Sequence, residues 1–175
     1  MITNHNYAQY LHEAVMSAVE QTWPAHQIII VDDASTDNSR NIITRLVYDH
    51  PSNVSAIYFD KNAGVAAARN AGIAAAQTEF VCCLDADDML HSRFLEAILP
   101  TMIANRNIGI GYSGLTIIDE HGKEKGQTGF PPQFNWEIQT QPTTPPSNCI
   151  PSACVFRKEM WERAGGVRQE YAVRS

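Results

Sequence analysis

The sequence predicts an α/β fold in which a mostly parallel sheet carries helices on both faces. Up to about residue 110, short runs of consecutive apolar residues alternate with segments whose apolar residues recur at helical spacing. Such runs are typical of strands that are buried on both faces of a parallel sheet. The length of 175 residues and the hydrophobic share of 44% indicate one globular domain.

Local signals place the elements of the first 110 residues. The sequence predicts strands at residues 27–31, 54–59 and 80–84, and helices at residues 10–19, 42–47, 65–77 and 92–98. Ser35 and Asp37 offer caps for the second helix, and Gly64 precedes the alanine-rich third helix. Pro24 ends the first helix, and Pro100 should end or kink the fourth.

The first residues of the chain lack the strand with which a sheet of this kind normally opens. The chain enters the first predicted helix almost directly, and Met1-Ile2-Thr3 leaves too few residues for an apolar strand. We therefore expect that the opening strand has been lost.

The pattern changes after residue 105. The apolar run at residues 108–118 predicts one strand, which is followed by a turn at residues 119–122. Residues 124–150 contain five prolines and few apolar runs, and a loop of that length in a compact domain is usually functional. A short strand at residues 153–156 and a helix at residues 158–164, closed by Gly165-Gly166, complete the prediction.

The charge distribution excludes some classes of partner. Residues 1–100 contain 12 acidic and 5 basic side chains, so the first half has no basic surface for a nucleic acid. No apolar stretch approaches the roughly 18 residues of a membrane span, and the first residues do not resemble a signal peptide. We expect a cytoplasmic protein, with the inner face of the membrane as an alternative location.

Two acidic clusters directly follow predicted strands. Asp32-Asp33 follows one buried strand, and Asp85, Asp87 and Asp88 follow another. Because ligands bind outside the carboxyl ends of parallel strands, we expect the five carboxylates to converge on one crevice. Their repulsion would be relieved by a cation, and Mg²⁺ or Mn²⁺ takes oxygen ligands. An aspartate in this position is also a common helix cap.

A third element joins a strand to the alanine-rich helix. Gly64 lies at this turn, where backbone N–H groups can face an anion. Arg69 lies one and a half turns into the helix, within reach of a phosphate group. A structural ion pair with a carboxylate of the crevice is the alternative role for Arg69.

The chain contains three segments in one order and spacing: Ile29-Ile-Val-Asp-Asp-Ala-Ser-Thr-Asp37, Asn62-Ala-Gly-Val-Ala-Ala-Ala-Arg-Asn-Ala-Gly72 and Leu84-Asp-Ala-Asp-Asp88. Together they resemble the family 2 glycosyltransferases, which have the GT-A fold. Residues 3–7, 21–24, 150–157 and 164–166 resemble further segments of that family. The resemblance implies an incomplete catalytic domain over residues 1–175, with a nucleotide-binding half at 1–105 and the start of an acceptor-side half at 106–175.

The resemblance also implies roles for single residues. Thr3, His5 and Asp33 would hold the nucleotide base, usually uracil. Asp85 and Ala86 would contact the nucleotide-sugar, together with Arg69, and Asp87 would ligate Mn²⁺ or Mg²⁺. Each of these residues lies in one of the segments that resemble the family's motifs.

The implied reaction is an inverting displacement. A sugar would pass from a nucleotide-diphosphate sugar to the hydroxyl of a carbohydrate or lipid-linked acceptor, assisted by the metal. The general base is expected beyond Ser175, because Glu170 aligns with a different acidic position of the family. Both ends are therefore expected to be trimmed. A homo-oligomer is one option for the assembly.

Two other functions stay open on the sequence alone. The chain could be a nucleotide-binding fragment without the general base, which a transfer assay would distinguish from an enzyme. The apolar run that ends in Asp32-Asp33 also resembles the acidic pair of a phosphorelay receiver domain. That fold needs a later strand ending in Lys, which this sequence lacks.

Overall fold

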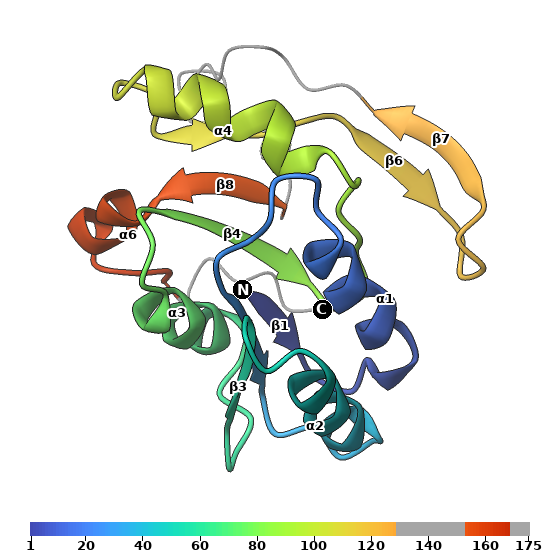
Figure 1. The fold of residues 1–175 in the computed structure, drawn as a ribbon. Coiled ribbons are helices and arrows are strands. Elements are labelled where there is room, and N and C mark those ends of the chain that lie inside the picture. Colours follow the sequence, from blue (N-terminus) through green and yellow to red (C-terminus); the bar gives the residue numbers. More distant parts are fainter. Residues whose placement is uncertain (129–152, 169–175) are drawn as a thin grey trace, which may run out of the picture.

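A six-stranded mixed sheet forms the centre of the protein, as the computed structural model shows (Figure 1). The structure describes residues 1–128 and 153–168. The strand order is β3-β2-β1-β4-β8-β5. The strands are β1 (Ile2–Asn4), β2 (Ile28–Asp32), β3 (Val54–Tyr58), β4 (Phe80–Asp85), β5 (Ile110–Gly111) and β8 (Cys154–Arg157). The first four strands are parallel, and β8 runs antiparallel to both β4 and β5.

Helices cover both faces of this sheet, as the apolar runs predict (Figure 1). The helices are α1 (Ala8–Val19), α2 (Ser39–Asp49), α3 (Val65–Ala75), α4 (Phe94–Ala104) and α6 (Lys158–Ala164). Buried residues of α1 and α2 pack with Ile30 and Leu84 on one face. Ala68 and Ile73 of α3 pack with Val81 on the other. The predicted α/β architecture is confirmed.

Helix α3 lies close to the sheet because its residues are small. A side-chain carbon added at Gly72 would lie 2.3 Å from Cε of Met1 and 3.1 Å from Cγ2 of Val31. No side chain fits at Gly72 without moving these two neighbours. The alanines and this glycine therefore set the distance between α3 and the central sheet.

The expectation that the opening strand has been lost is wrong. Residues Ile2–Asn4 form β1, and each of them is buried. The strand lies between β2 and β4 and pairs with both in parallel, with Ile2 level with Ile30 and Leu84. Three residues suffice because both edges of the strand are hydrogen-bonded to neighbouring strands.

Pro100 does not end the fourth helix, which continues to Ala104. A proline inside a helix removes one backbone hydrogen bond and strains the preceding turn. Leu99 and Met102 are nevertheless buried against β8 and the start of β4. The packing of this face holds the helix together across the proline.

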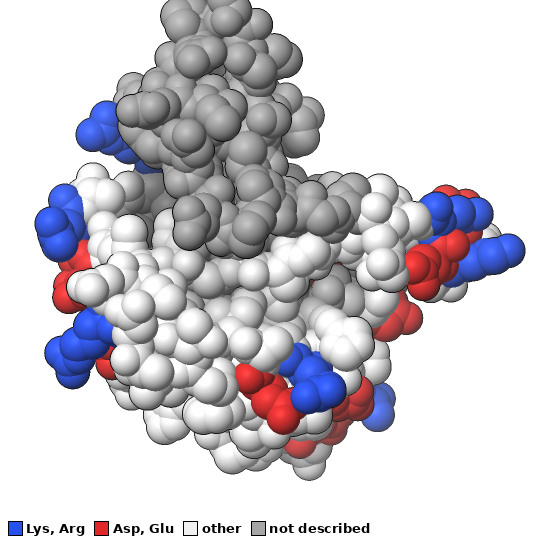
Figure 2. Space-filling model, turned by 90° about the horizontal axis from the view of Figure 1, so that it is seen from above, with Lys and Arg blue, Asp and Glu red and all other residues white. Residues whose placement is uncertain are grey.

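The apolar run at residues 108–118 forms two strands in place of one. β5 joins the central sheet, whereas β6 (Leu115–Ile118) pairs with β7 (Glu124–Thr128) in a separate two-stranded sheet. The predicted turn at residues 119–122 connects β6 to β7, and charged side chains of both signs gather at this projecting tip (Figure 2). The rest of the predicted loop at 124–150, and Glu170, lie outside the described residues.

Among residues 1–128 and 153–168, no helix combines the length and the apolar character needed to cross a bilayer.

Arg157 ties the antiparallel part of the sheet to α4. The residue is 3% exposed, and its guanidinium donates to the carbonyl oxygens of Met102 at 2.6 Å and Ile108 at 3.1 Å. It also pairs with Glu79 and lies 4.8 Å from the ring centre of Phe80. One side chain thus satisfies carbonyl groups at the end of α4 and before β5.

We predict that Arg157→Met destabilises the protein by about 3 kcal/mol, because buried carbonyl oxygens lose their donor. Urea unfolding would measure the loss. The control is Arg45→Met, which removes an exposed arginine paired with the half-exposed Asp49 and should leave the unfolding midpoint unchanged. Equal midpoints for the two variants would contradict the assigned role of Arg157.

Candidate active site

The candidate site lies at the carboxyl ends of the parallel strands. Strand β1 has β2 on one side and β4 on the other, and the chain reaches β4 only after crossing from β3 on the far edge. This change of direction is the topological switch point at which open parallel sheets bind ligands. Thr3 of β1, Asp33 after β2 and Asp85 of β4 all lie at this edge.

Thr3, Arg69 and Asp85 form one hydrogen-bonded group. Nη2 of Arg69 donates to both carboxylate oxygens of Asp85, at 2.8 and 3.0 Å, and Oγ1 of Thr3 donates to Oδ1 at 3.0 Å. Burial alone would lower the pKa of the Arg69 guanidinium, but the charge and hydrogen bonds of Asp85 hold that pKa above its usual value. The Arg69 guanidinium therefore stays charged at neutral pH.

Arg69 keeps unused hydrogen-bonding capacity. Its Nε is buried and has no partner among the described residues. A cavity of about 460 Å³ adjoins this side chain. It is lined by Val65, Ala66, Arg69, Ala164, Gly166, Val167 and Arg168. The two roles expected for Arg69 are thus compatible, since an ion pair with Asp85 leaves part of the guanidinium beside a cavity.

Asp33 fills the position in which an anion was expected. Its carboxylate accepts the N–H of Ala63 at 2.7 Å and the N–H of Gly64 at 2.8 Å. Gly64 has a φ of 87°, which a glycine adopts readily. The backbone donors before α3 therefore bind Asp33 in this structure, and this contact fixes the turn. A contact of Asp33 with a nucleotide base stays a prediction.

His5 is held in a single orientation beside Asp33. Its Nδ1 lies 2.7 Å from the carbonyl oxygen of Asp33, and its Nε2 lies 3.2 Å from Nδ2 of Asn62. A carbonyl only accepts, so Nδ1 carries the proton and Nε2 accepts from the amide of Asn62. The imidazole is thus positioned at the edge where the resemblance expects the base of a nucleotide.

The five carboxylates do not converge as expected. Asp32 is fully buried and accepts from Arg40 at 3.1 Å and from Asn4 at 2.9 Å. Asp33 and Asp85 are bound as described above. Within residues 1–128 and 153–168, no three carboxylate, histidine or cysteine side chains are grouped so as to hold a metal ion. The prediction from strand ends alone fails because each buried acid has its own donor.

Asp87 and Asp88 are the exposed acids at this edge. They follow Ala86, which is buried and whose N–H donates to the carbonyl oxygen of Thr3 at 3.1 Å. This contact fixes the turn that presents Asp87 to solvent. One or two exposed carboxylates suit Mg²⁺ or Mn²⁺, which keep water ligands and share phosphate oxygens. The exposed carboxylates at this edge therefore fit a metal ion that takes its remaining ligands from water and from a diphosphate.

Two asparagines for which the sequence predicts no role of their own, Asn4 and Asn6, organise the loops of the site. Asn6 has a φ of 60°, and its Oδ1 accepts the N–H of Thr36 at 2.7 Å. Ser35 Oγ accepts from Asn4 Nδ2 and from the N–H of Asn6. Asn after a strand tolerates a left-handed backbone and bonds to nearby backbone groups, which is the signal that identifies Asn6.

Ala34 carries backbone strain next to Asp33. Its φ is 58°, a left-handed conformation that costs an alanine roughly 1–2 kcal/mol. The contacts of Ser35 and Thr36 with Asn4 and Asn6 hold the loop in this form. The strained residue directly follows Asp33, whose carbonyl oxygen accepts a hydrogen bond from His5.

Asn70 attaches the segment after α6 to α3. Its Oδ1 accepts from Trp161 Nε1 at 2.8 Å and from the N–H of Val167 at 2.7 Å, and its Nδ2 donates to the carbonyl oxygen of Val167 at 2.9 Å. Gly166 and Val167 form part of the wall of the cavity beside Arg69. Asn70 thus positions one wall of the candidate site.

The cysteines within residues 1–128 and 153–168 do not supply a reactive group. Burial raises the pKa of the Cys82 thiol to about 12 and that of the Cys154 thiol to about 11. Both thiols are therefore protonated at neutral pH, which agrees with small buried side chains. Cys149 lies outside the described residues.

We predict that Asn70→Ala releases the segment at Val167, because all three hydrogen bonds of its side chain are lost. Hydrogen exchange would measure the effect, with the amide of Val167 exchanging at least ~10-fold faster. Asn41→Ala is the control, since the Asn41 side chain bonds to the exposed Asn38, away from Val167. Unchanged exchange at Val167 in the Asn70 variant would remove the positioning role.

Solved structures share the fold of this chain. TarS 1–349 of S. aureus in complex with UDP superimposes with a TM-score of 0.70 at 17% identity, covering 94% of this chain and 48% of that one. A mannosyltransferase of Pyrobaculum calidifontis in complex with GDP-Man and Mn²⁺ gives 0.66 at 20% identity, covering 94% and 45%. The fold is of the GT-A type.

Sequence comparison identifies the family. An uncharacterized glycosyltransferase of Nostoc sp. is 36% identical over 167 residues, and a putative teichuronic acid biosynthesis glycosyltransferase of Bacillus subtilis is 32% identical over 120. The matches cover 93% and 68% of this chain, which spans about half the length of these relatives. The profile of "Glycosyl transferase family 2" matches residues 1–165, so the chain belongs to that family.

Proposed function

We propose that this chain is the donor-binding part of a glycosyltransferase that transfers a sugar from a nucleotide-diphosphate sugar, UDP-linked in the simplest case, to an acceptor hydroxyl. The observation that carries the proposal is the paired group Thr3–Arg69–Asp85 at the switch point, with the exposed Asp87 two residues later. Solved neighbours of the same fold bind UDP, UDP-GlcNAc and GDP-Man, which supports a nucleotide-sugar as the ligand.

Thr3, His5, Asp33, Arg69, Asp85 and Ala86 have distinct tasks in this proposal. His5 and Asp33, locked to each other and to the turn before α3, offer a fixed surface for the base. Asp85 accepts hydrogen bonds from ribose or sugar hydroxyls through those lone pairs of its carboxylate that Arg69 and Thr3 do not use. Arg69 holds negative charge at the cavity beside it. Ala86 keeps the turn close to β1.

Asp87 is the proposed ligand of Mn²⁺ or Mg²⁺. A divalent ion supplies neutralisation of the charge that builds up on a departing diphosphate. Asp87 holds its carboxylate toward solvent at the sheet edge, where a diphosphate can complete the set of oxygen ligands. The P. calidifontis neighbour was solved with Mn²⁺, which supports this assignment.

The acceptor side of the proposal depends on residues beyond those described. The general base is expected beyond Ser175, and an inverting reaction needs such a base to take the proton of the acceptor hydroxyl. A carbohydrate or a lipid-linked glycan is the proposed acceptor. Among the curated relatives, one is described as a putative teichuronic acid biosynthesis enzyme, which supports a polymer of the cell envelope.

The alternatives differ in topology or in assay outcome. A receiver domain has the strand order 2-1-3-4-5 in an all-parallel sheet, whereas this sheet contains the antiparallel strand β8 next to β4. The topology thus argues against the phosphorelay function. A nucleotide-binding fragment without transfer would bind UDP and metal but would neither transfer nor hydrolyse the donor.

We predict that UDP binds in the presence of Mn²⁺ and that Asp87→Asn weakens this binding by ~10-fold or more, because a carboxylate ligand is lost. Calorimetry with and without EDTA would separate the metal-dependent part. Glu120→Gln is the matched control, an exposed acid in the turn between β6 and β7 that should bind UDP like the unaltered chain. Absence of UDP binding with and without metal would refute the proposal.

A further inference from the structure

The cavity beside Arg69 has two arginines in its wall. Arg69 lines it from α3, and Arg168 lines it from the segment that follows α6. The other described residues of the wall are apolar or small: Val65, Ala66, Ala164, Gly166 and Val167. The wall that the structure describes therefore contains two positive charges and no acidic side chain, which favours an anionic ligand. The cavity volume of about 460 Å³ is typical of sites that bind small molecules.

The backbone that carries Arg168 is tied to the helix that carries Arg69. The N–H of Val167 donates to Oδ1 of Asn70 at 2.7 Å, and the carbonyl oxygen of Val167 accepts from Nδ2 of Asn70 at 2.9 Å. A side-chain carbon added at Gly166 would lie 3.1 Å from Oδ1 of Asn70, so the chain passes close to α3 here. Asn70 directly follows Arg69, and these contacts hold both arginines at one cavity.

The ion pair of Arg69 with Asp85 leaves donors for a ligand. Both hydrogen bonds to the carboxylate come from Nη2, so Nε and Nη1 take no part in the pair. A guanidinium has five N–H donors, and each arginine can keep its contacts within the protein and bind a ligand as well. The planar arrangement of these donors matches a pair of carboxylate or phosphate oxygens.

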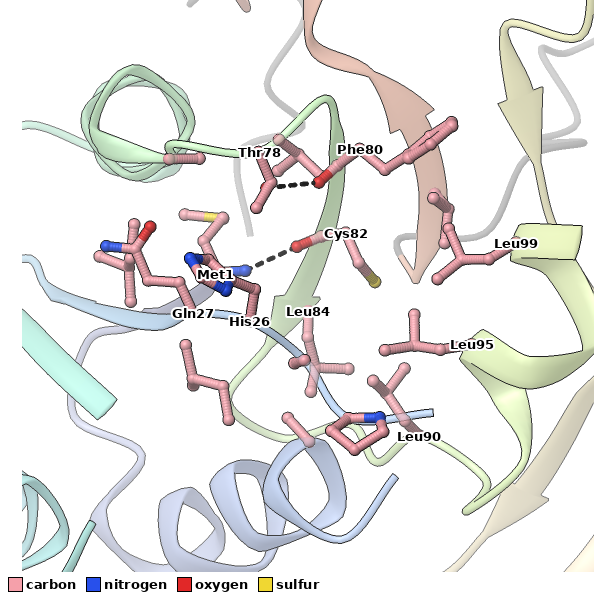
Figure 3. Close-up of a pocket in the computed structure, with 18 of the residues that line it drawn as sticks. Met1, His26, Gln27, Thr78, Phe80, Cys82, Leu84, Leu90, Leu95 and Leu99 are labelled. Carbon is pink, nitrogen blue, oxygen red and sulfur yellow. Dashed lines mark hydrogen bonds between the residues drawn. The ribbon is translucent and has the colours of Figure 1, made fainter. Parts of the chain in front are cut away.

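A second cavity has a different character. It has a volume of about 230 Å³, lies at the beginnings of β2 and β4, and is lined in part by Leu84, Leu90, Leu95 and Leu99 (Figure 3). None of the described residues in its wall is a lysine or an arginine. Of the two cavities, the one beside Arg69 therefore offers counter-charges to an anion.

The other residues of the candidate site indicate which part of a donor lies at this cavity. In the proposed function, His5 and Asp33 bind the base, and Asp87 binds the metal of the diphosphate. None of these three residues lines the cavity. Asp85, which accepts from sugar hydroxyls in that proposal, is bonded to Arg69 at the cavity wall. The transferred sugar is thus the part of the donor that lies next to the two arginines.

We propose that this cavity selects a donor whose sugar carries a carboxylate, as a hexuronic acid does, and that Arg168 confers this specificity together with Arg69. The specificity rests on the proposed function, because it requires a nucleotide-sugar at the site. In a hexuronic acid, a carboxylate replaces the neutral hydroxymethyl group of the hexose. Its two oxygens accept paired, charge-assisted hydrogen bonds from a guanidinium, which a hydroxymethyl group cannot match.

Calorimetry with matched donors tests this specificity. UDP-glucuronic acid and UDP-glucose differ only at carbon 6 of the sugar, which is a carboxylate in one and a hydroxymethyl group in the other. UDP-galacturonic acid and UDP-galactose form a second pair with the opposite configuration at carbon 4. In the presence of Mn²⁺, we expect the uronic acid of at least one pair to bind the chain at least ~10-fold more tightly than its neutral partner.

Variants of Arg168 assign the preference to the cavity. Arg168→Gln removes one guanidinium and should reduce the preference to below ~3-fold. Arg168→Glu places a carboxylate in the wall and should make the neutral donor the tighter ligand of the pair. Arg163→Gln is the matched control, because Arg163 is an exposed arginine of the last turn of α6 outside the cavity lining. This control should keep the preference of the unaltered chain.

The outcomes distinguish a failure of the specificity from a failure of the proposed function. If UDP binds with Mn²⁺ but neither uronic acid donor binds more tightly than its neutral partner, the specificity is wrong and the proposed function stands. A preference that survives in Arg168→Gln would place the carboxylate elsewhere and would overturn the assignment to this cavity. No binding of UDP or of any of the four donors would overturn both.

A further arm examines whether the anion belongs to the acceptor. Methyl glucuronide is added to the chain loaded with UDP-glucose, so that a neutral sugar already occupies the donor position. We expect no binding of the glucuronide that depends on Arg168. Binding that is lost in Arg168→Gln would show that the cavity takes the anionic group of a second substrate, and would overturn the assignment to the donor sugar.

Discussion

The three residues of β1 hold the two parts of the central sheet together. β2 and β3 lie on one side of this strand, and β4, β8 and β5 lie on the other. The side chains of β1 extend the same link into the candidate site, since Thr3 donates to Asp85 of β4 and Asn4 donates to Asp32 of β2. Residues that come from three separate elements therefore keep their relative positions only while β1 stays in register.

Three of the acidic side chains at the carboxyl ends of the strands have their own hydrogen-bond donors. Asp32 is matched by Arg40, Asp33 by two backbone N–H groups and Asp85 by Arg69. These contacts offset much of the repulsion among the carboxylates at this edge. Asp87 and Asp88 are exposed at the same edge. In the proposed function, the ion would arrive with a diphosphate that supplies further oxygen ligands.

The sequence predicts most elements of the nucleotide-binding half because the apolar runs and helical spacings there agree with the tertiary packing. Predictions fail where long-range contacts override a local signal. Ile2–Asn4 is too short to stand out as a strand, yet strands on both sides bury it. Pro100 is a helix breaker, yet Leu99 and Met102 are anchored around it. For the site, strand ends locate Asp33 and Asp85 correctly, but only the fold reveals that Asp32 turns toward Arg40 and that Asn70 bonds to Val167.

The shortness of β1 makes its register the sensitive point of the site. A slip by one residue would turn Thr3 to the opposite face of the sheet, away from Arg69 and Asp85. A three-residue strand has few ladder bonds with which to resist such a slip. Contacts at Met1 add to them, because its nitrogen and carbonyl both bond to β4 and its side chain packs against Gly72 of α3. Met1 directly precedes β1 and Thr3 lies at the candidate site, so the packing around Met1 helps to fix the hydroxyl that bonds to Asp85.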